Sequence, residues 1–124
     1  MNTEIQEVEI NGVKYVRKDS VVATAALNSK NAVIIRSETA GAFFGYVLEK
    51  NEAAGVVKLA QARRLWYWDG AASLSQLAME GTSKPQSCKF PVAVTELTVC
   101  KVIEIIPVTE NSIASINGVK VWKA

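Results

Sequence analysis

Short runs of β-branched and aromatic residues, separated by turn-forming residues, are the feature of this sequence that most constrains its fold. Near the start, Val8 and Ile10 alternate with glutamates, Asn11-Gly12 interrupts the pattern, and Val13 begins a second apolar run. Asn-Gly between two such runs is the strongest short signal of a β-hairpin. We therefore predict that the chain opens with a hairpin.

Several later runs have the composition of further strands. They are residues 32–36, the glycine-flanked stretch GAFFGYVLEKN at 41–51, residues 56–59, residues 64–68, and the runs FPVAV and LTVCKVIEIIPV between residues 90 and 108. The last two runs predict either two strands or one long bent strand, which Pro107 closes. Residues 18–31 have no firm period and predict a loop or a marginal helix.

Capping signals predict two short helices. Ser73 fits a capping box with the glutamine three residues later, and Gly81 is placed as a C-terminal cap, which predicts a helix at about 73–80. Thr109 can cap a last small helix, which residues 117–118 end. The chain is therefore predicted to be α+β, with a mostly antiparallel β-sheet and two short helices.

The sequence Asn-Gly-Val-Lys occurs twice, at residues 11–14 and 117–120. No longer period supports an internal duplication, so turn chemistry followed by a β-prone pair is the simpler interpretation. The two segments are candidates for neighbouring strands of the sheet.

Length and charge exclude several classes of protein. The 124 residues fit one domain, spanning residues 1–124, and the net charge of +2 is too small for a protein that coats duplex nucleic acid. Any anion recognised here must meet a local cluster of charges. No stretch approaches the roughly 20 apolar residues that span a bilayer, and the start lacks a secretory pattern. We expect a cytoplasmic protein without a membrane partner.

The absence of histidine restricts the chemistry further. With no histidine and two widely spaced cysteines, a zinc site and a disulfide framework are both disfavoured. Cys88 and Cys100 are expected to be reduced thiols that are at least partly buried. Nucleophile pairs that need histidine are excluded as well. We expect a protein that is not an enzyme and carries no cofactor.

The segment RRLWYWD at residues 63–69 concentrates cationic and aromatic side chains. In an extended chain, alternation places three residues on each face: Arg64, Trp66 and Trp68 on one, and Arg63, Leu65 and Tyr67 on the other. An arginine beside two indoles can bind a phosphate bidentately while a purine stacks on the ring. The alternative is that both indoles are core and that Arg64 covers their edge through a cation–π contact.

Three further residues are candidates for the same site. Asp69 either pairs with an arginine or supports an Asp-Gly turn, and the backbone N–H groups of residues 72–74 could receive a phosphate at the helix start. Arg36 ends an apolar run and either points into a cleft or pairs with Glu38. Phe90 either stacks a base or fills the core.

Three stretches carry a resemblance to known proteins: WYWDGAASLSQLAMEG, RSETAGAFFGYV and KPQSCKFPVAVTE. They resemble a family of small phage and prophage proteins, from about residue 32 to the C-terminal VWKA. In size and pocket chemistry the chain is also similar to the Thoeris anti-defence sponges. Those β-rich, oligomeric phage proteins sequester cyclic ADP-ribose-type signals made by bacterial TIR proteins. The resemblance implies a phage protein that acts in the host bacterial cytoplasm, and it transfers no residue roles.

Together, these observations predict a binding protein that sequesters a small nucleotide immune signal without cleaving it. The expected ligand-binding residues are Arg36, Arg63, Arg64, Trp66, Trp68, Asp69 and Phe90. Homo-oligomerisation, as a dimer or a larger assembly, is expected because a second subunit supplies walls for the pocket.

Two other functions stay open at this point. One is a protein–protein interaction module, or an inhibitor of a host protein, that presents Trp66, Tyr67 and Trp68 as hot spots. The other is a nucleotide-degrading enzyme that uses Asp69 and Glu80, although nothing nearby completes an acid–base pair.

Overall fold

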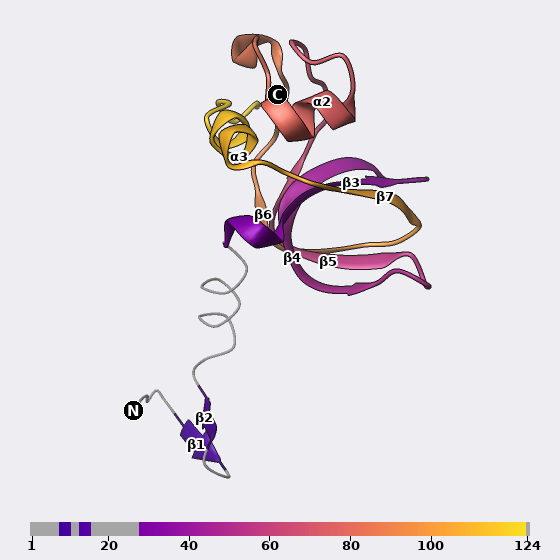
Figure 1. Ribbon diagram of the computed structural model, residues 1–124, viewed down its shortest axis with the longest axis vertical. Coiled ribbons are helices and arrows are strands. Elements are labelled where there is room, and N and C mark those ends of the chain that lie inside the picture. Colours follow the sequence, from indigo (N-terminus) through magenta and orange to yellow (C-terminus); the bar gives the residue numbers. More distant parts are fainter. Residues whose placement is uncertain (1–7, 11–12, 16–27, 124) are drawn as a thin grey trace.

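A computed structural model describes the protein at residues 8–10, 13–15 and 28–123. In chain order the elements are β1 (Val8–Ile10), β2 (Val13–Tyr15), the 3-10 helix η1 (Ser29–Asn31), β3 (Ala32–Ser37), β4 (Gly41–Asn51), β5 (Val56–Arg64), α2 (Leu74–Glu80), the 3-10 helix η2 (Pro85–Ser87), β6 (Val94–Val99), β7 (Val102–Pro107) and α3 (Glu110–Asn117). Within these described residues, five strands form one antiparallel sheet in the order β6-β5-β4-β3-β7, and two α-helices accompany it (Figure 1). The predicted α+β fold is confirmed.

The predicted N-terminal hairpin is also present. β1 and β2 pair antiparallel, with Ile10 opposite Val13, and form a separate two-stranded sheet. The Asn-Gly turn itself and most of residues 18–31 lie outside the described residues. The expected pairing of the two Asn-Gly-Val-Lys segments is wrong, because β2 pairs with β1 and Val121 bridges to Phe90 instead.

The five-stranded sheet is strongly curled. The curl brings its two edge strands, which are consecutive in the chain, close enough for a short connection to join them. β6 and β7 lie at opposite edges of the sheet and are joined by Cys100 and Lys101. Ser37 Oγ donates to the Cys100 carbonyl at 2.7 Å, which ties this connection to the end of β3. Both cysteines are free; Cys88 is buried as expected, whereas Cys100 in this connection is exposed, contrary to the expectation.

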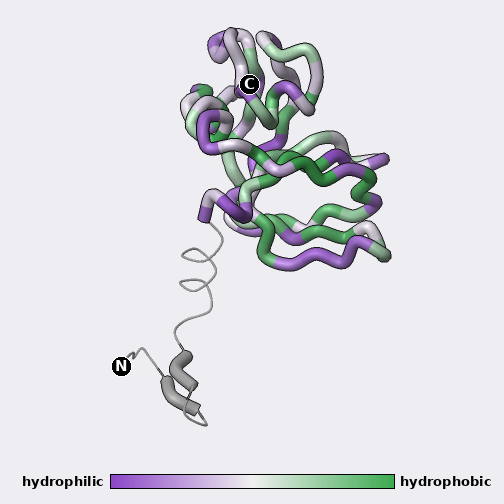
Figure 2. Tube along the Cα trace, viewed as in Figure 1, coloured by the Kyte–Doolittle hydropathy of each residue, from purple (hydrophilic) through white to green (hydrophobic). Residues whose placement is uncertain are grey.

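The curl creates two hydrophobic cores on the two faces of the sheet. The inner core lies within the curl and consists of Val33, Ile35, Phe43, Val57, Leu59, Ala62 and Val99. The outer core lies between the sheet and the helical layer, and it includes Ile34, Phe44, Leu77, Phe90 and Ile116. Because successive side chains of a strand point to opposite faces, β3 serves both cores and reads as one continuous apolar run. Figure 2 shows this hydrophobic character along the strands.

Both predicted helices are confirmed, including their caps. The Ser73 side chain accepts a hydrogen bond from Gln76 N at 3.2 Å and begins α2, and Gly81 ends it with a φ of 77°. A Cβ at Gly81 would collide with Ser115, so only glycine fits there. Thr109 caps α3 in the same way as Ser73 caps α2. Among residues 28–123, no helix is long and apolar enough to cross a membrane.

β5 differs from the prediction. The sequence favoured separate strands at 56–59 and 64–68, whereas the structure has one strand that ends at Arg64. Its pairing with the segment that follows η2 keeps a single register, in which Val57 faces Val99, Ala62 faces Val94 and Tyr67 faces Lys89. The ladder is interrupted before Tyr67, where Pro91 has no N–H to donate and Leu65 N donates instead to the Ala42 carbonyl of β4. There, the Arg63 side chain donates to the Pro91 carbonyl at 3.1 Å.

Candidate functional site

Arg63 is a structural anchor, not a ligand-binding residue. Its guanidinium donates to four backbone carbonyl oxygens, those of Pro91, Ile116, Phe90 and Val119, at distances of 2.7 to 3.1 Å. The residue is only 5% exposed. Burial lowers the pKa of the guanidinium, but arginine has so high a pKa that the group stays charged at pH 7. The carbonyl at the end of α3 also favours a cation. The N–H donors of Arg63 are therefore used in hydrogen bonds within the fold.

Arg64 lies on the opposite side of the strand from Arg63. It is exposed, donates to the Ala40 carbonyl at 2.8 Å, and places its guanidinium carbon 4.4 Å from the centroid of the Phe43 ring. A cation–π contact of the predicted kind is present, but the ring belongs to Phe43 and not to a tryptophan. Arg64 thus covers an edge of the inner core.

Arg36 is separated from Arg64 by strand β4 and projects from the other face of the sheet. It pairs with Ala42 of the outer core in the sheet register, whereas Arg64 pairs with Phe43 of the inner core. Arg36 Nε lies 3.1 Å from Glu104 Oε1 on β7, so its acidic partner is Glu104 and not Glu38. The arginines expected to converge on one phosphate lie in three different surroundings.

The other predicted residues are also dispersed. Phe90 is fully buried in the outer core, so its ring is not accessible to stack a base. Trp68 is partly buried against the same core. Asp69 Oδ1 accepts from Gly70 N at 2.8 Å and supports the turn, and Ala72 N donates to a glutamine side chain, not to a free anion site. Trp66, by contrast, is 61% exposed.

The structure brings a different set of side chains together. Lys89 N donates to the Tyr67 carbonyl at 2.7 Å, and Tyr67 N donates back to the Lys89 carbonyl at 3.3 Å. On the other side of the segment that contains Lys89 and Phe90, Trp122 N donates to the Phe90 carbonyl at 3.0 Å. Lys89 Nζ lies 5.8 Å from the ring centroid of Tyr67 and 5.6 Å from that of Trp122. We call the side chains of Tyr67, Lys89, Lys120 and Trp122 the lysine–aromatic surface.

A groove of about 400 Å³ adjoins this surface. Its lining residues are Pro85, Gln86, Cys88, Gly118, Lys120, Val121 and Trp122. No acidic residue is among them, and the flanking segments 84–93 and 118–123 contain four lysines and no Asp or Glu. The groove therefore offers an aromatic ring and positive charge to an anion.

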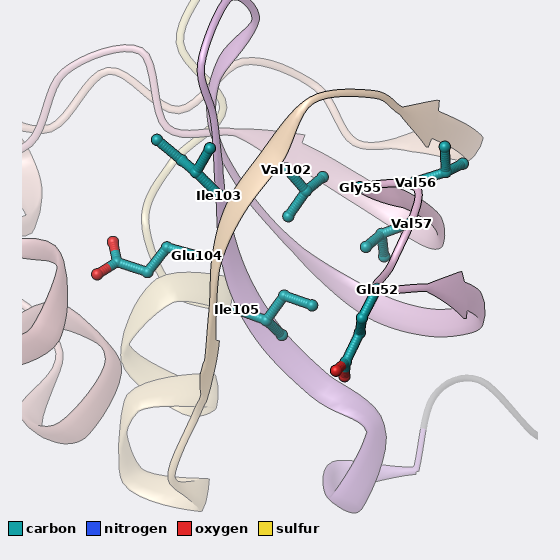
Figure 3. A pocket seen from close by; sticks show the side chains of 8 residues that line it. All are labelled: Glu52, Gly55, Val56, Val57, Val102, Ile103, Glu104 and Ile105. Atoms are coloured by element: carbon teal, nitrogen blue, oxygen red, sulfur yellow. The ribbon is translucent and has the colours of Figure 1, made fainter.

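A second hollow, of about 330 Å³, has the opposite character. It lies between β7 and the turn from β4 to β5, and apolar side chains including Val57, Val102 and Ile105 line it (Figure 3). Its charged lining residues are Glu52 and Glu104, and Figure 3 shows Glu104 pointing away on the other side of β7. Carboxylates repel phosphate, so this hollow does not suit a nucleotide.

Sequence reasoning missed part of the lysine–aromatic surface. Lys89, Lys120 and Trp122 were not singled out, and Tyr67 entered only through the interaction hypothesis. The signal that could have found them is the interleaving of lysine with aromatic residues in CKFP and VKVWK, a pattern suited to anionic ligands with bases. Nothing local to either segment indicates that the fold places them side by side.

The fold and this surface define a class: a small α+β domain that exposes aromatic rings and lysines on an irregular layer above a curled sheet. Within that class, the model of a family described as a domain of unknown function (DUF6948) matches residues 30–116, and the chain belongs to this family. The match includes Tyr67 and Lys89 and ends before Trp122. A comparison with curated proteins and one with solved structures each find no significant match.

Proposed function

We propose that this protein captures a small phosphorylated nucleotide at the lysine–aromatic surface and does not cleave it. The observation that carries the proposal is the Lys89 ammonium, which lies 5.8 Å and 5.6 Å from the centroids of two exposed rings, beside a groove without acidic lining. A base can stack on an aromatic ring while ammonium groups neutralise its phosphate. The proposed ligand is of the class expected from the sequence, but the proposed binding site contains Lys89 instead of the arginines.

The biological role that fits this chemistry is sequestration of an immune signal. The resemblance to phage anti-defence sponges favours a cyclic ADP-ribose-type ligand, held in the cytoplasm of an infected bacterium. Capture needs only binding, and no carboxylate lines the groove to serve as a general base. A homo-oligomer would let a second subunit cover the groove and bury the ligand further.

The proposal is tested by capture and release. Full-length protein is incubated with cyclic ADP-ribose isomers or AMP, separated from free ligand, and heated, and the supernatant is analysed chromatographically. Intact nucleotide in the supernatant is expected. Altered nucleotide would show an enzyme, and no capture would remove the proposed function.

A matched pair of lysine variants locates the site. Lys89→Ala should weaken affinity about tenfold, because a charge-assisted contact to phosphate is lost. Lys50→Ala removes an exposed lysine of β4 that pairs with Glu52, and it should leave affinity unchanged. Equal effects of the two variants would place the ligand elsewhere.

An interaction module is the second candidate, and a separate group of exposed apolar side chains favours it. Trp66 is 61% exposed, Val92 66% and Val94 45%. In the register that pairs Ala62 with Val94, Val92 faces the position of Arg64. Exposed tryptophan beside arginine is typical of hot spots. For this function Trp66→Ala should abolish binding of a protein partner and leave nucleotide capture intact.

A further inference from the structure

We infer that the lysine–aromatic surface binds two bases joined through a phosphate, which is a dinucleotide unit, in preference to a mononucleotide. This inference rests on the proposed capture of a phosphorylated nucleotide, and it extends the ligand class beyond a cyclic ADP-ribose-type molecule, which has a single base. It depends on the number and placement of the aromatic rings, which the proposed function alone does not use.

The geometry comes from three extended segments that lie side by side. Tyr67 pairs with Lys89 on one side of the central segment, and Val121 bridges to Phe90 on the other. Neighbouring extended chains lie about 4.8 Å apart, so the two outer segments are about 10 Å apart. Main-chain hydrogen bonds hold all three segments, so this spacing does not depend on the side chains that they present.

Two rings therefore stand on either side of one ammonium. Tyr67 is 49% exposed and Trp122 is 37% exposed, and Lys89 Nζ lies within 6 Å of both ring centroids. A dinucleotide has the same order of groups, with a base, a phosphodiester and a second base. An unstacked dinucleotide can place one base on each ring and its phosphate at Lys89. A mononucleotide leaves one ring unused.

The surrounding charge supports a ligand that carries more than one phosphate. Lys84, Lys120 and Lys123 belong to the same two segments as Lys89 and Trp122, and no acidic residue lies in either segment. Free dinucleotides and single-stranded nucleic acid share this base-phosphate-base chemistry. The length of the ligand distinguishes these two sources.

The test compares three ligands on the full-length protein by isothermal titration calorimetry: AMP, the 5′-phosphorylated adenylate dinucleotide, and an adenylate octamer. The dinucleotide should bind about tenfold more tightly than AMP, because a second base stacks. If the octamer binds no more tightly than the dinucleotide, the natural ligand is a free dinucleotide. If the octamer binds more tightly, the natural ligand is single-stranded nucleic acid. Equal affinity of AMP and the dinucleotide would overturn the inference.

Ring-specific variants complete the test. Tyr67→Leu and Trp122→Leu keep apolar bulk but lack a ring, so each should reduce dinucleotide affinity to the level of AMP. Trp66→Leu changes an exposed aromatic outside the surface and should have no effect. If AMP binds and Lys89→Ala weakens it, but the dinucleotide gains nothing, only this inference fails. If neither these ligands nor the cyclic ADP-ribose isomers bind, the proposed function fails with it.

Discussion

The inner core is enclosed by regular strands, whereas the outer core is covered by short helices and irregular segments that need buried polar side chains. Around the inner core, sheet ladders satisfy most of the backbone. Over the outer core, Arg63 donates to four carbonyls, and the fully buried Ser112 hydroxyl donates to the Leu77 carbonyl. Irregular segments leave carbonyls unpaired, so side chains must supply the donors. The candidate binding surface lies on this irregular layer, as is common for functional sites on rigid scaffolds.

The largest effect is expected where the outer core depends on one side chain. Arg63→Ala should lower the free energy of unfolding by about 4 kcal/mol, because buried carbonyls lose their donor. Urea denaturation measures this loss, and Arg63→Lys should recover only part of it, since an ammonium cannot reproduce the guanidinium fork. A loss below about 1 kcal/mol would show that the outer core does not need this anchor.

The inner core should respond to lost volume instead of lost hydrogen bonds. Leu59 is fully buried there, and Leu59→Ala should cost about 3 kcal/mol through the cavity that it leaves. Hydrogen exchange separates the two cores. Leu59→Ala should reduce amide protection mainly in β3, β4 and β5, and Arg63→Ala mainly in residues 88–91 and 116–122. Identical exchange patterns would contradict the division into two cores.

The smallest effect is expected for the neighbouring arginine. Arg64→Ala removes an exposed guanidinium that lies over Phe43, and it should change the free energy of unfolding by about 0.5 kcal/mol. The same denaturation experiment as for Arg63 provides the measurement. A loss comparable to that of Arg63→Ala would show that the two consecutive arginines have equivalent roles.

Local signals explain which parts of the fold could be predicted from the sequence. The Ser73 and Thr109 caps, the glycine after α2 and the continuous apolar run of β3 act within a few residues, and each was predicted correctly. β5 was divided wrongly: separate strands were favoured at 56–59 and 64–68, whereas one strand runs from Val56 to Arg64. The carbonyls that accept hydrogen bonds from Arg63 lie between 27 and 56 residues further along the chain, so no local pattern predicts these contacts.

The candidate site was predictable in chemistry but not in location. Aromatic rings beside cations were expected from residues 63–69, and Tyr67 belongs to that segment. Lys89 and Trp122 join it only because extended segments pair across the helical layer, and that pairing follows from tertiary packing. The arginines failed to converge because strand pleating sends Arg36 and Arg64 to opposite faces.

The main-chain pairing of Tyr67 with Lys89, and of Phe90 with Val121, has a consequence for how the specificity of this protein can change. The framework is fixed by backbone atoms, which every residue except proline provides in full. Side chains at positions 67, 89 and 122 can therefore be exchanged while the scaffold is retained. Substitutions at these positions can therefore change the molecule that is recognised without a change of fold.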